Sequence, residues 1–224
     1  MTRKTVKKSV TRRQENAALR RTAIINAALD EFAEKGFAAA RMEDVAQRAA
    51  VAKGTIYLHF TDKDALFEAI VNQEIRPSID ALTALAARGG SLRDFVEETL
   101  LPLLSDLART RRGAVLRMLL GEAERFPKLA EVYYSLVIGP ALNSIRVLLQ
   151  RANKRRDLAA PMLLQFPQLL VTLIPMTVIW TGLFERFEHL DVERMARAYF
   201  DLFLGGDRTK RGASFKETNK ATRG

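Results

Sequence analysis

The sequence predicts an all-α protein in which a connecting helix joins a small N-terminal three-helix domain to a larger helical domain. Apolar residues recur at the spacing of amphipathic helices, and no convincing run alternates with the period of two that strands require. Residues 41–63, RMEDVAQRAAVAKGTIYLHFTDK, also have the core spacing of a helix-turn-helix. The expected division is a flexible basic arm (1–20), a helix-turn-helix domain (21–70), a helical body (71–205) and a disordered basic tail (206–224).

The first helix is expected from near Glu15 to Gly36, where a glycine can adopt the left-handed conformation that ends a helix. Its inward stripe follows the i, i+3, i+4, i+7 spacing and consists of Ile25, Ala28, Leu29 and Phe32. In the helix-turn-helix, Val45 faces inward from the first helix, and Ile56 and Phe60 face back from the second. Residues 50–52 leave room only for a tight turn.

The connecting helix is expected to begin at Thr61, with Asp64 as its capping-box partner, and to run past Pro77 toward Ala87. Ser91 should cap the next helix. Further helices are expected over residues 91–110 with a kink at Pro102, 114–126, 127–153 with a bend at Gly139 and Pro140, and 191–204. The runs 111–113 and 154–156 are expected to be loops.

The helix-turn-helix carries the functional hypothesis, because a second helix held across a first by a tight turn fits the major groove of DNA. The second helix, from Lys53 to about Phe60, presents Lys53, Thr55, Tyr57 and His59 on its non-core faces. All four side chains can donate hydrogen bonds to phosphates or base edges. The alternative is a solvated helical hairpin with ordinary surface residues.

Four segments together resemble the DNA-binding domain of the tetracycline-repressor (TetR) family of bacterial transcriptional regulators. They are AALDEFAEKGF (27–37), MEDVAQRA (42–49), KGTIYLHF (53–60) and KDALFEAI (63–70). The chain departs from the family pattern where Ala40 and Arg41 replace a hydroxyl residue, where Ala50 replaces glycine in the turn, and where Ala52 replaces a capping residue. Phosphate contacts by hydroxyl groups are therefore not expected at these positions, although Arg41 offers a charge instead.

The resemblance implies a sequence-specific DNA-binding regulator, most simply a repressor, whose operator is a palindrome read by a homodimer. Tyr57, His59 and Lys63 are the expected phosphate contacts, and Lys53 and Thr55 are the expected base contacts. Gly54 suits a backbone that must approach a phosphate closely. The two C-terminal helices, near residues 169–187 and 192–204, are apolar on more than one face and are the expected dimer contact.

The family's body usually holds a small-molecule effector, and binding there shifts the protein to a state that does not fit its operator. A largely apolar pocket for an apolar or aromatic ligand is expected here. Its candidate lining residues are Phe95, Met118, Glu122, Phe126, Tyr133, Asn143, Phe166, Met176 and Trp180. The alternative for each of these residues is ordinary core packing, and for Glu122 an exposed position.

Composition limits the other function classes. The net charge of +10 lies in the two ends of the chain, because residues 1–21 carry +7 and residues 207–224 carry +4. A basic arm before a helix-turn-helix can reach phosphates, but it can equally be a solubilising segment. The absence of cysteine fits a reducing cytosol, and no secretory signal is visible, so a cytoplasmic location is expected.

Three other functions are less consistent with the sequence. A DNA-coating protein without sequence preference would suit the basic tails but would not need the large neutral body. An enzyme is disfavoured because the sequence contains no phosphate loop and no nucleophile motif. Glu185 and His189 have a spacing that would let them share a metal ion, but no further ligands lie near them in the sequence. Neither a metal nor a cofactor is therefore expected. Residues 158–184 carry no charge, but Gln165, Gln168, Pro167 and Pro175 favour a buried helix over a membrane span.

Overall fold

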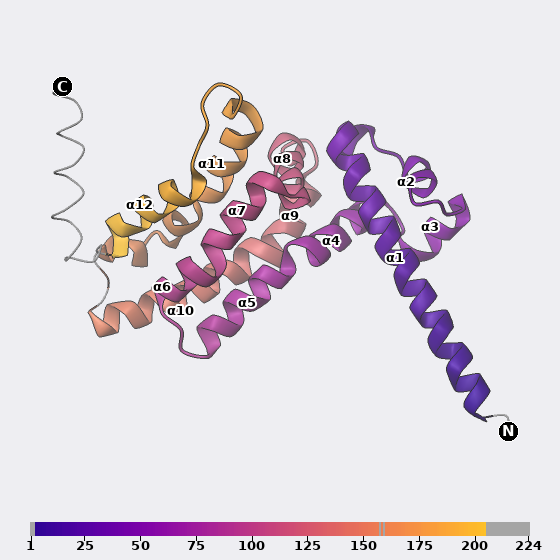
Figure 1. Cartoon of the computed structure of the whole chain (residues 1–224), viewed down its shortest axis with the longest axis horizontal. Coiled ribbons are helices and arrows are strands. Elements are labelled where there is room, and N and C mark those ends of the chain that lie inside the picture. The colour runs from indigo at the N-terminus through magenta and orange to yellow at the C-terminus, as the bar shows by residue number, and fades with distance from the viewer. Residues whose placement is uncertain (1–2, 157, 159, 205–224) are drawn as a thin grey trace. The chain divides into compact units, whose positions relative to one another are not determined.

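A computed structural model describes residues 3–156, 158 and 160–204, and it is helical with no strand among these residues (Figure 1). The predicted all-α fold is therefore confirmed. The chain divides into two compact units that are each discontinuous in sequence. The first contains the residues up to Pro77 together with 110–139, and the second contains 78–109 together with the residues from Pro140 onward.

The N-terminal part of the first unit contains four helices: α1 (Arg3–Ala39), α2 (Met42–Arg48), α3 (Lys53–His59) and α4 (Lys63–Glu74). The helix-turn-helix prediction agrees with α2 and α3 to within one residue at each end. The predicted flexible arm is different, because α1 is helical from Arg3 rather than from near Glu15. Its basic sequence lacks an apolar stripe, but Lys, Arg and Gln are good helix formers and do not oppose a helix.

The stripe predicted for α1 is buried, and Ile25, Ala28, Leu29 and Phe32 are each at most 3% exposed. An ionic cluster then fixes α1 to α2. The guanidinium group of Arg48 donates to both carboxylate oxygens of Glu34 at 2.8 and 2.5 Å and to Glu31 at 3.2 Å. Because Glu31 is only 1% exposed, its carboxylate requires such cationic partners.

The predicted connecting helix is divided in two, α4 and α5 (Arg76–Ala87), with Ile75 between them. Asp62, and not the predicted Thr61, caps α4, because its carboxylate accepts a hydrogen bond from the backbone N–H of Ala65 at 2.8 Å. Both residue types are good caps, so the sequence alone left the choice between neighbouring positions open.

Two further helices complete the first unit, α8 (Arg111–Glu122) and α9 (Pro127–Tyr133), with a π-helical turn η2 (Tyr134–Ile138) after them. Helix α8 packs against α1, and α9 packs against α4. The loop predicted at residues 111–113 is thus the first turn of α8. The first unit is larger than the predicted helix-turn-helix domain, because it takes in helices expected to belong to the body.

The second unit is formed by α5 and the segments α6 (Leu92–Phe95), η1 (Val96–Leu100), α7 (Leu101–Arg109), α10 (Gly139–Arg155), η3 (Pro161–Leu164), η4 (Pro167–Val171), α11 (Leu173–Ile179), η5 (Trp180–Phe184) and α12 (Val192–Leu204). Ser91 caps α6 in a capping box with Asp94, and the carboxylate of Asp191 accepts from the Arg194 N–H at 3.0 Å. The cap predicted at Ser91 is confirmed, and the helix expected over residues 191–204 is capped by Asp191 at its start. Residues 92–109 form one helical run, and Pro102 comes two residues after its π-helical turn η1, so the regular hydrogen-bond pattern changes next to the residue that has no N–H donor.

The uncharged segment is not one buried helix, because it is divided among η3, η4, α11 and η5. By length and composition alone, the helical stretches Pro127–Arg155 and Pro167–Phe184 would be long and apolar enough to cross a membrane. Core helices of water-soluble proteins pass the same test. The closing glycines predicted after the last helix, and the basic tail, lie outside the described residues.

Candidate nucleic-acid interface

Helix α3 is held by its inward face and leaves its other faces open. Ile56 is fully buried and Phe60 is 4% exposed, and they pack in the same core as Val45 and Ala46 of α2. The turn between the helices places Ala50 at φ 53°, in the left-handed region that the sequence pattern predicts for this position. The Val51 N–H donates to the Ala46 carbonyl at 3.0 Å and closes the turn.

Neither helix of the motif has a side-chain cap. Arg41 occupies the N-cap position of α2 and Ala52 that of α3, and no side chain there accepts a hydrogen bond from the helix. The first N–H groups of a helix have no partner within it, so at an uncapped end they are satisfied by water or by a ligand. Arg41 is exposed beside this edge of the motif.

Gly54 is exposed in the first turn of α3, and packing within the chain does not require a glycine there. A Cβ atom added at this position would meet no heavy atom within 4 Å. Glycine in a helix costs about 1 kcal/mol relative to alanine. A residue with this cost and no packing role inside the chain fits a position that an external group approaches closely.

Lys53 is already paired within the chain. Its Nζ lies 2.8 Å from the carboxylate of Glu43 on α2, and this contact raises the pKa of Lys53 and lowers the pKa of Glu43. Both side chains are about half exposed or more, so the pair is weak and exchangeable. Lys53 can therefore exchange Glu43 for a partner outside the chain.

The remaining outward residues of α3 include Leu58, which was not among the predicted DNA contacts. Tyr57 is 45% exposed, whereas Thr55 and His59 are half-buried. Leu58 is 84% exposed, more than any other large apolar residue among those described. Its position was readable from the sequence, because a residue two positions after Ile56 cannot share the buried face of a helix.

Lys63 lies in a different environment from the solvent-facing one expected for a phosphate contact. Its Nζ donates to the backbone carbonyls of Phe37 at 2.6 Å and Ala38 at 3.1 Å, and it lies 4.8 Å from the centre of the Phe37 ring. Burial lowers the pKa of Lys63. The ammonium group thus ties the start of α4 to the end of α1 and has little capacity left for an anion.

The carbonyls that Lys63 reaches follow a break in α1 at Gly36, which has φ 76° and ψ 166°. Glu122 from the end of α8 lies over this break and accepts a hydrogen bond from the Ala38 N–H at 3.4 Å. The ring of Phe126 packs on that of Phe37, with 5.2 Å between ring centres. Helix α8 therefore contacts the link that leads into the helix-turn-helix.

The residues predicted to bind an effector are divided between the units. Met118, Glu122, Phe126 and Tyr133 belong to the first unit, and Phe95, Asn143, Phe166, Met176 and Trp180 belong to the second. Met118 and Glu122 line a common cavity of about 390 Å³ beside Gly36. Tyr133 is buried, and desolvation raises its pKa.

The five predicted pocket residues in the second unit differ in exposure. Phe95 is buried, and the half-buried Trp180 donates from its ring nitrogen to the Glu188 carbonyl at 3.0 Å. Asn143, Phe166 and Met176 are exposed. Close by, Glu185 and His189 contact each other, and within the described residues no group of three His, Cys, Asp or Glu is arranged to hold a metal ion.

The second unit also exposes many large apolar side chains, and most of them lie between η3 and α12. They are Met162, Leu164, Phe166, Met176, Ile179, Leu183, Phe184, Phe187 and Leu202. This set of residues is called the C-terminal apolar surface below. Exposed large apolar side chains that are concentrated in one part of a chain are candidates for an interaction site.

Comparison with known proteins agrees with this arrangement. Residues 24–70 match the model of the bacterial regulatory proteins of the tetR family, and residues 86–201 match a tetracyclin repressor-like C-terminal domain. The chain is 32% identical to the uncharacterized HTH-type transcriptional regulator YdeS of Bacillus subtilis over 61% of its own length and 66% of the length of YdeS. The chain thus spans just under two thirds of this curated relative.

Solved structures share the fold at lower identity. NalD, the secondary repressor of the MexAB-OprM multidrug efflux pump in Pseudomonas aeruginosa, is 22% identical with a TM-score of 0.67, over 85% of this chain and 100% of NalD. The transcriptional regulator FadR from Bacillus subtilis, solved with stearoyl-CoA, is 19% identical with a TM-score of 0.63, over 83% of this chain and 98% of FadR.

A helix-turn-helix head followed by a helical body defines a class of transcriptional regulators. Both parts match models of a single family, and the second match alone covers more than half of the chain. The protein therefore belongs to the TetR family of bacterial transcriptional regulators.

Proposed function

We propose that this protein is a cytoplasmic repressor that binds a palindromic operator as a homodimer and is released by a small apolar or aromatic effector. The observation that carries the proposal is the open outer surface of α3, where an uncapped N-terminus and an unpacked glycine stand beside exposed polar side chains. These are the features of a helix whose backbone approaches a phosphate while its side chains reach base edges.

Within this proposal, the base contacts are Lys53, which exchanges Glu43 for a base edge, and Thr55. Tyr57 and His59 contact phosphates, as do the backbone at Gly54 and the Arg41 side chain at the edge of the motif. Leu58 joins the base-reading set, since an exposed aliphatic side chain on a recognition helix suits contact with a thymine methyl group. Lys63 is left out, because its ammonium group is bound inside the unit.

Dimerisation supplies the second recognition helix. Six of the nine residues of the C-terminal apolar surface lie on the segments predicted for the dimer contact, and a second copy of the chain would bury them. Two heads would then bind half-sites one helical turn, about 34–36 Å, apart. The effector is proposed to bind in the first unit, where Met118 and Glu122 line the cavity beside Gly36 and Glu122 contacts the link into the helix-turn-helix.

Selection of binding sequences from a random DNA pool at physiological salt tests the DNA-binding part of the proposal. The purified wild-type protein should enrich a short palindrome, and a Gly54→Leu variant, which places a bulky side chain between backbone and phosphate, should enrich none. Lys154→Ala serves as a control, because it removes one positive charge far along the sequence from the head and should leave the palindrome unchanged.

The rival function, DNA coating without sequence preference, gives a different result in the same experiment. The protein would retain DNA but enrich no motif, and its affinities for the best and the average sequence would be equal at every salt concentration. A specific regulator should favour its operator by roughly 10³-fold or more.

A further inference from the structure

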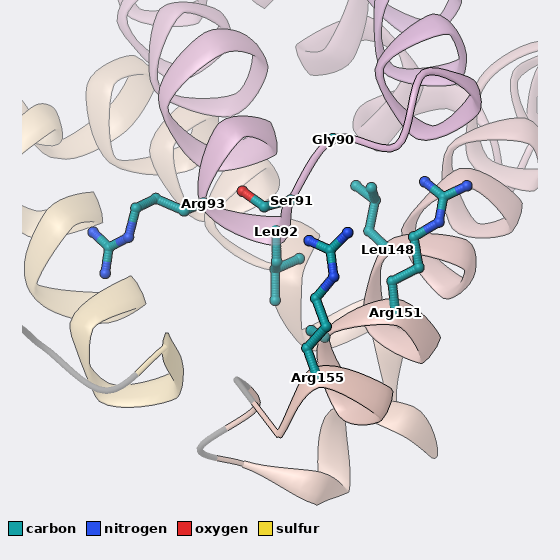
Figure 2. Close-up of a pocket in the computed structure, with 8 residues that line it drawn as sticks. Gly90, Ser91, Leu92, Arg93, Leu148, Arg151 and Arg155 are labelled. Carbon is teal, nitrogen blue, oxygen red and sulfur yellow. The ribbon is translucent and has the colours of Figure 1, made fainter.

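A second cavity, in the second unit, has no role in the proposed function. It has a volume of about 430 Å³ and lies where the loop between α5 and α6 passes the C-terminal end of α10 (Figure 2). The loop contributes Gly90 and Ser91, α6 contributes Leu92, and α10 contributes Leu148, Arg151 and Arg155. Cavities of several hundred Å³ are the size that small-molecule sites usually have.

The cavity combines an apolar floor with a cationic wall. Leu92 and Leu148 are buried at 3% and 1% exposure. Arg151 and Arg155 lie one turn apart on α10; Figure 2 shows the Arg155 guanidinium group directed toward the Gly90–Ser91 loop, and that of Arg151 donates to the Ala86 carbonyl of α5. A third lining arginine, Arg93, projects to the far side of Leu92, and no acidic residue is part of the lining.

Arg151 and Arg155 have unused hydrogen-bonding capacity. Within the described residues Arg155 makes no hydrogen bond or ion pair, and Arg151 donates only to the backbone carbonyl of Ala86. Each guanidinium group carries five N–H donors. Two like charges one helical turn apart also repel each other, so that an anion between them is favoured.

The nearest acidic side chains on the loop side are engaged elsewhere. Asp94 accepts from the Ser91 N–H at 2.7 Å in the capping box, and Glu98 pairs with Arg88 at 2.6 Å. The loop itself is tightly held, because a Cβ atom at Gly90 would lie 2.4 Å from a methyl carbon of Leu85. Among the described residues, the cationic wall therefore has no acidic partner, and it is bounded by a fixed loop.

We infer that this cavity binds a small organic anion whose phosphate or carboxylate groups are held by Arg151 and Arg155 and whose apolar part rests on Leu92 and Leu148. Arginine suits either oxyanion, because its planar fork donates two parallel hydrogen bonds to a phosphate or a carboxylate. The inference is independent of DNA binding and of the effector pocket proposed above.

Isothermal titration calorimetry on the full-length protein tests this inference, with inorganic pyrophosphate and succinate as separate probes at constant ionic strength. Arg155→Ala should weaken binding of the accepted probe by roughly tenfold or more, and Arg155→Lys should give a smaller loss, because the charge stays while the fork is lost. Lys154→Ala is the matched control, since it removes the neighbouring cation of the same helix end, which does not line the cavity.

Binding of pyrophosphate alone would identify a phosphate site, and binding of succinate alone a carboxylate site. Equal losses in Arg155→Ala and Lys154→Ala would overturn the inference, because they would indicate only the general attraction of anions to a basic helix end. The inference would also be overturned if neither probe bound the wild-type protein at 10 mM. A binding free energy of ~4 kcal/mol corresponds to a Kd of about 1 mM, so this concentration is about tenfold above that Kd.

Discussion

At the scale of single residues, a lysine beside a recognition helix can serve the fold instead of the DNA. Lys63 is the first residue of α4 and lies on a polar face, and this is a position where the sequence suggests a phosphate contact. Its actual partners, the carbonyls of Phe37 and Ala38, lie 26 and 25 residues earlier in the chain and are reached only after α1 breaks at Gly36. Such a long-range pairing cannot be predicted from spacing within the motif.

Replacing Lys63 with methionine should therefore reduce stability more than DNA binding. The variant keeps an apolar stem over Phe37 but loses two charge-assisted hydrogen bonds, so we expect the free energy of unfolding to fall by about 1–3 kcal/mol. Chemical denaturation measures this loss. The salt dependence of operator affinity, measured on the folded protein, should not change.

A phosphate role for Lys63 would give the opposite pattern. Stability would be retained, and the slope of log K against log salt would become shallower by about one for each protomer.

Leu58 is expected to act on sequence preference alone. Because its side chain is 84% exposed, Leu58→Ala should leave thermal stability unchanged. It should relax the preference for thymine at one position of each half-site and weaken operator binding by ~1–2 kcal/mol per protomer, the value of a buried aliphatic contact. Competition binding against single-base operator variants checks this; an unchanged preference at every position would remove Leu58 from base reading.

At the scale of secondary-structure elements, local signals predicted the helix-turn-helix well. The spacing of Val45, Ile56 and Phe60 placed both helices, and the structure has Ala50 at φ 53° and an uncapped Ala52, as the departures from the family pattern predict. These features depend on neighbours within a few residues. The contacts of α8 with α1 were not predictable in the same way, because Glu122 and Ala38 are 84 residues apart.

The break at Gly36 and the position of Glu122 should be coupled energetically. A Cβ atom at Gly36 would lie 2.6 Å from a carboxylate oxygen of Glu122, and the combination of φ 76° with ψ 166° is adopted almost only by glycine and costs other residues about 1–3 kcal/mol. Gly36→Ala should therefore lower the free energy of unfolding by more than this backbone cost alone. Denaturant titrations of the single and double variants measure the difference.

In the double variant Gly36→Ala, Glu122→Ala, the clash is absent and only the backbone cost remains. The double-mutant cycle should therefore show that Glu122→Ala partly compensates for Gly36→Ala. Additive effects of the two substitutions would contradict the close approach of α8 to the break in α1.

At the scale of the whole molecule, the exposure of the C-terminal apolar surface has no explanation within a single copy of the chain. Its residues are apolar in the sequence, which is why the two C-terminal helices were predicted to dimerise, but their exposure could only come from the structure. Phe187 and Leu183 are 75% and 60% exposed. Burial of such side chains contributes roughly 1.5–3 kcal/mol each.

The double variant Leu183→Glu, Phe187→Glu should therefore be largely monomeric at concentrations where the wild-type protein is dimeric, and it should bind the operator weakly. Sedimentation velocity over a dilution series measures the association. Leu120→Glu is the control, because Leu120 is a 52% exposed apolar residue of α8 outside this surface. Persistence of the dimer in the double variant would assign the contact to another surface.

The discontinuous first unit has a consequence for how the protein is made. Its core needs α8 and α9 against α1 and α4, but residues 110–139 are synthesised after the whole of α5 to α7. The head therefore cannot reach its final packing when its own residues leave the ribosome, because the ring of Phe37 packs on Phe126, which is synthesised later. A fragment ending near Pro77 would keep the recognition helix but would lack the helices that cover α1 and α4.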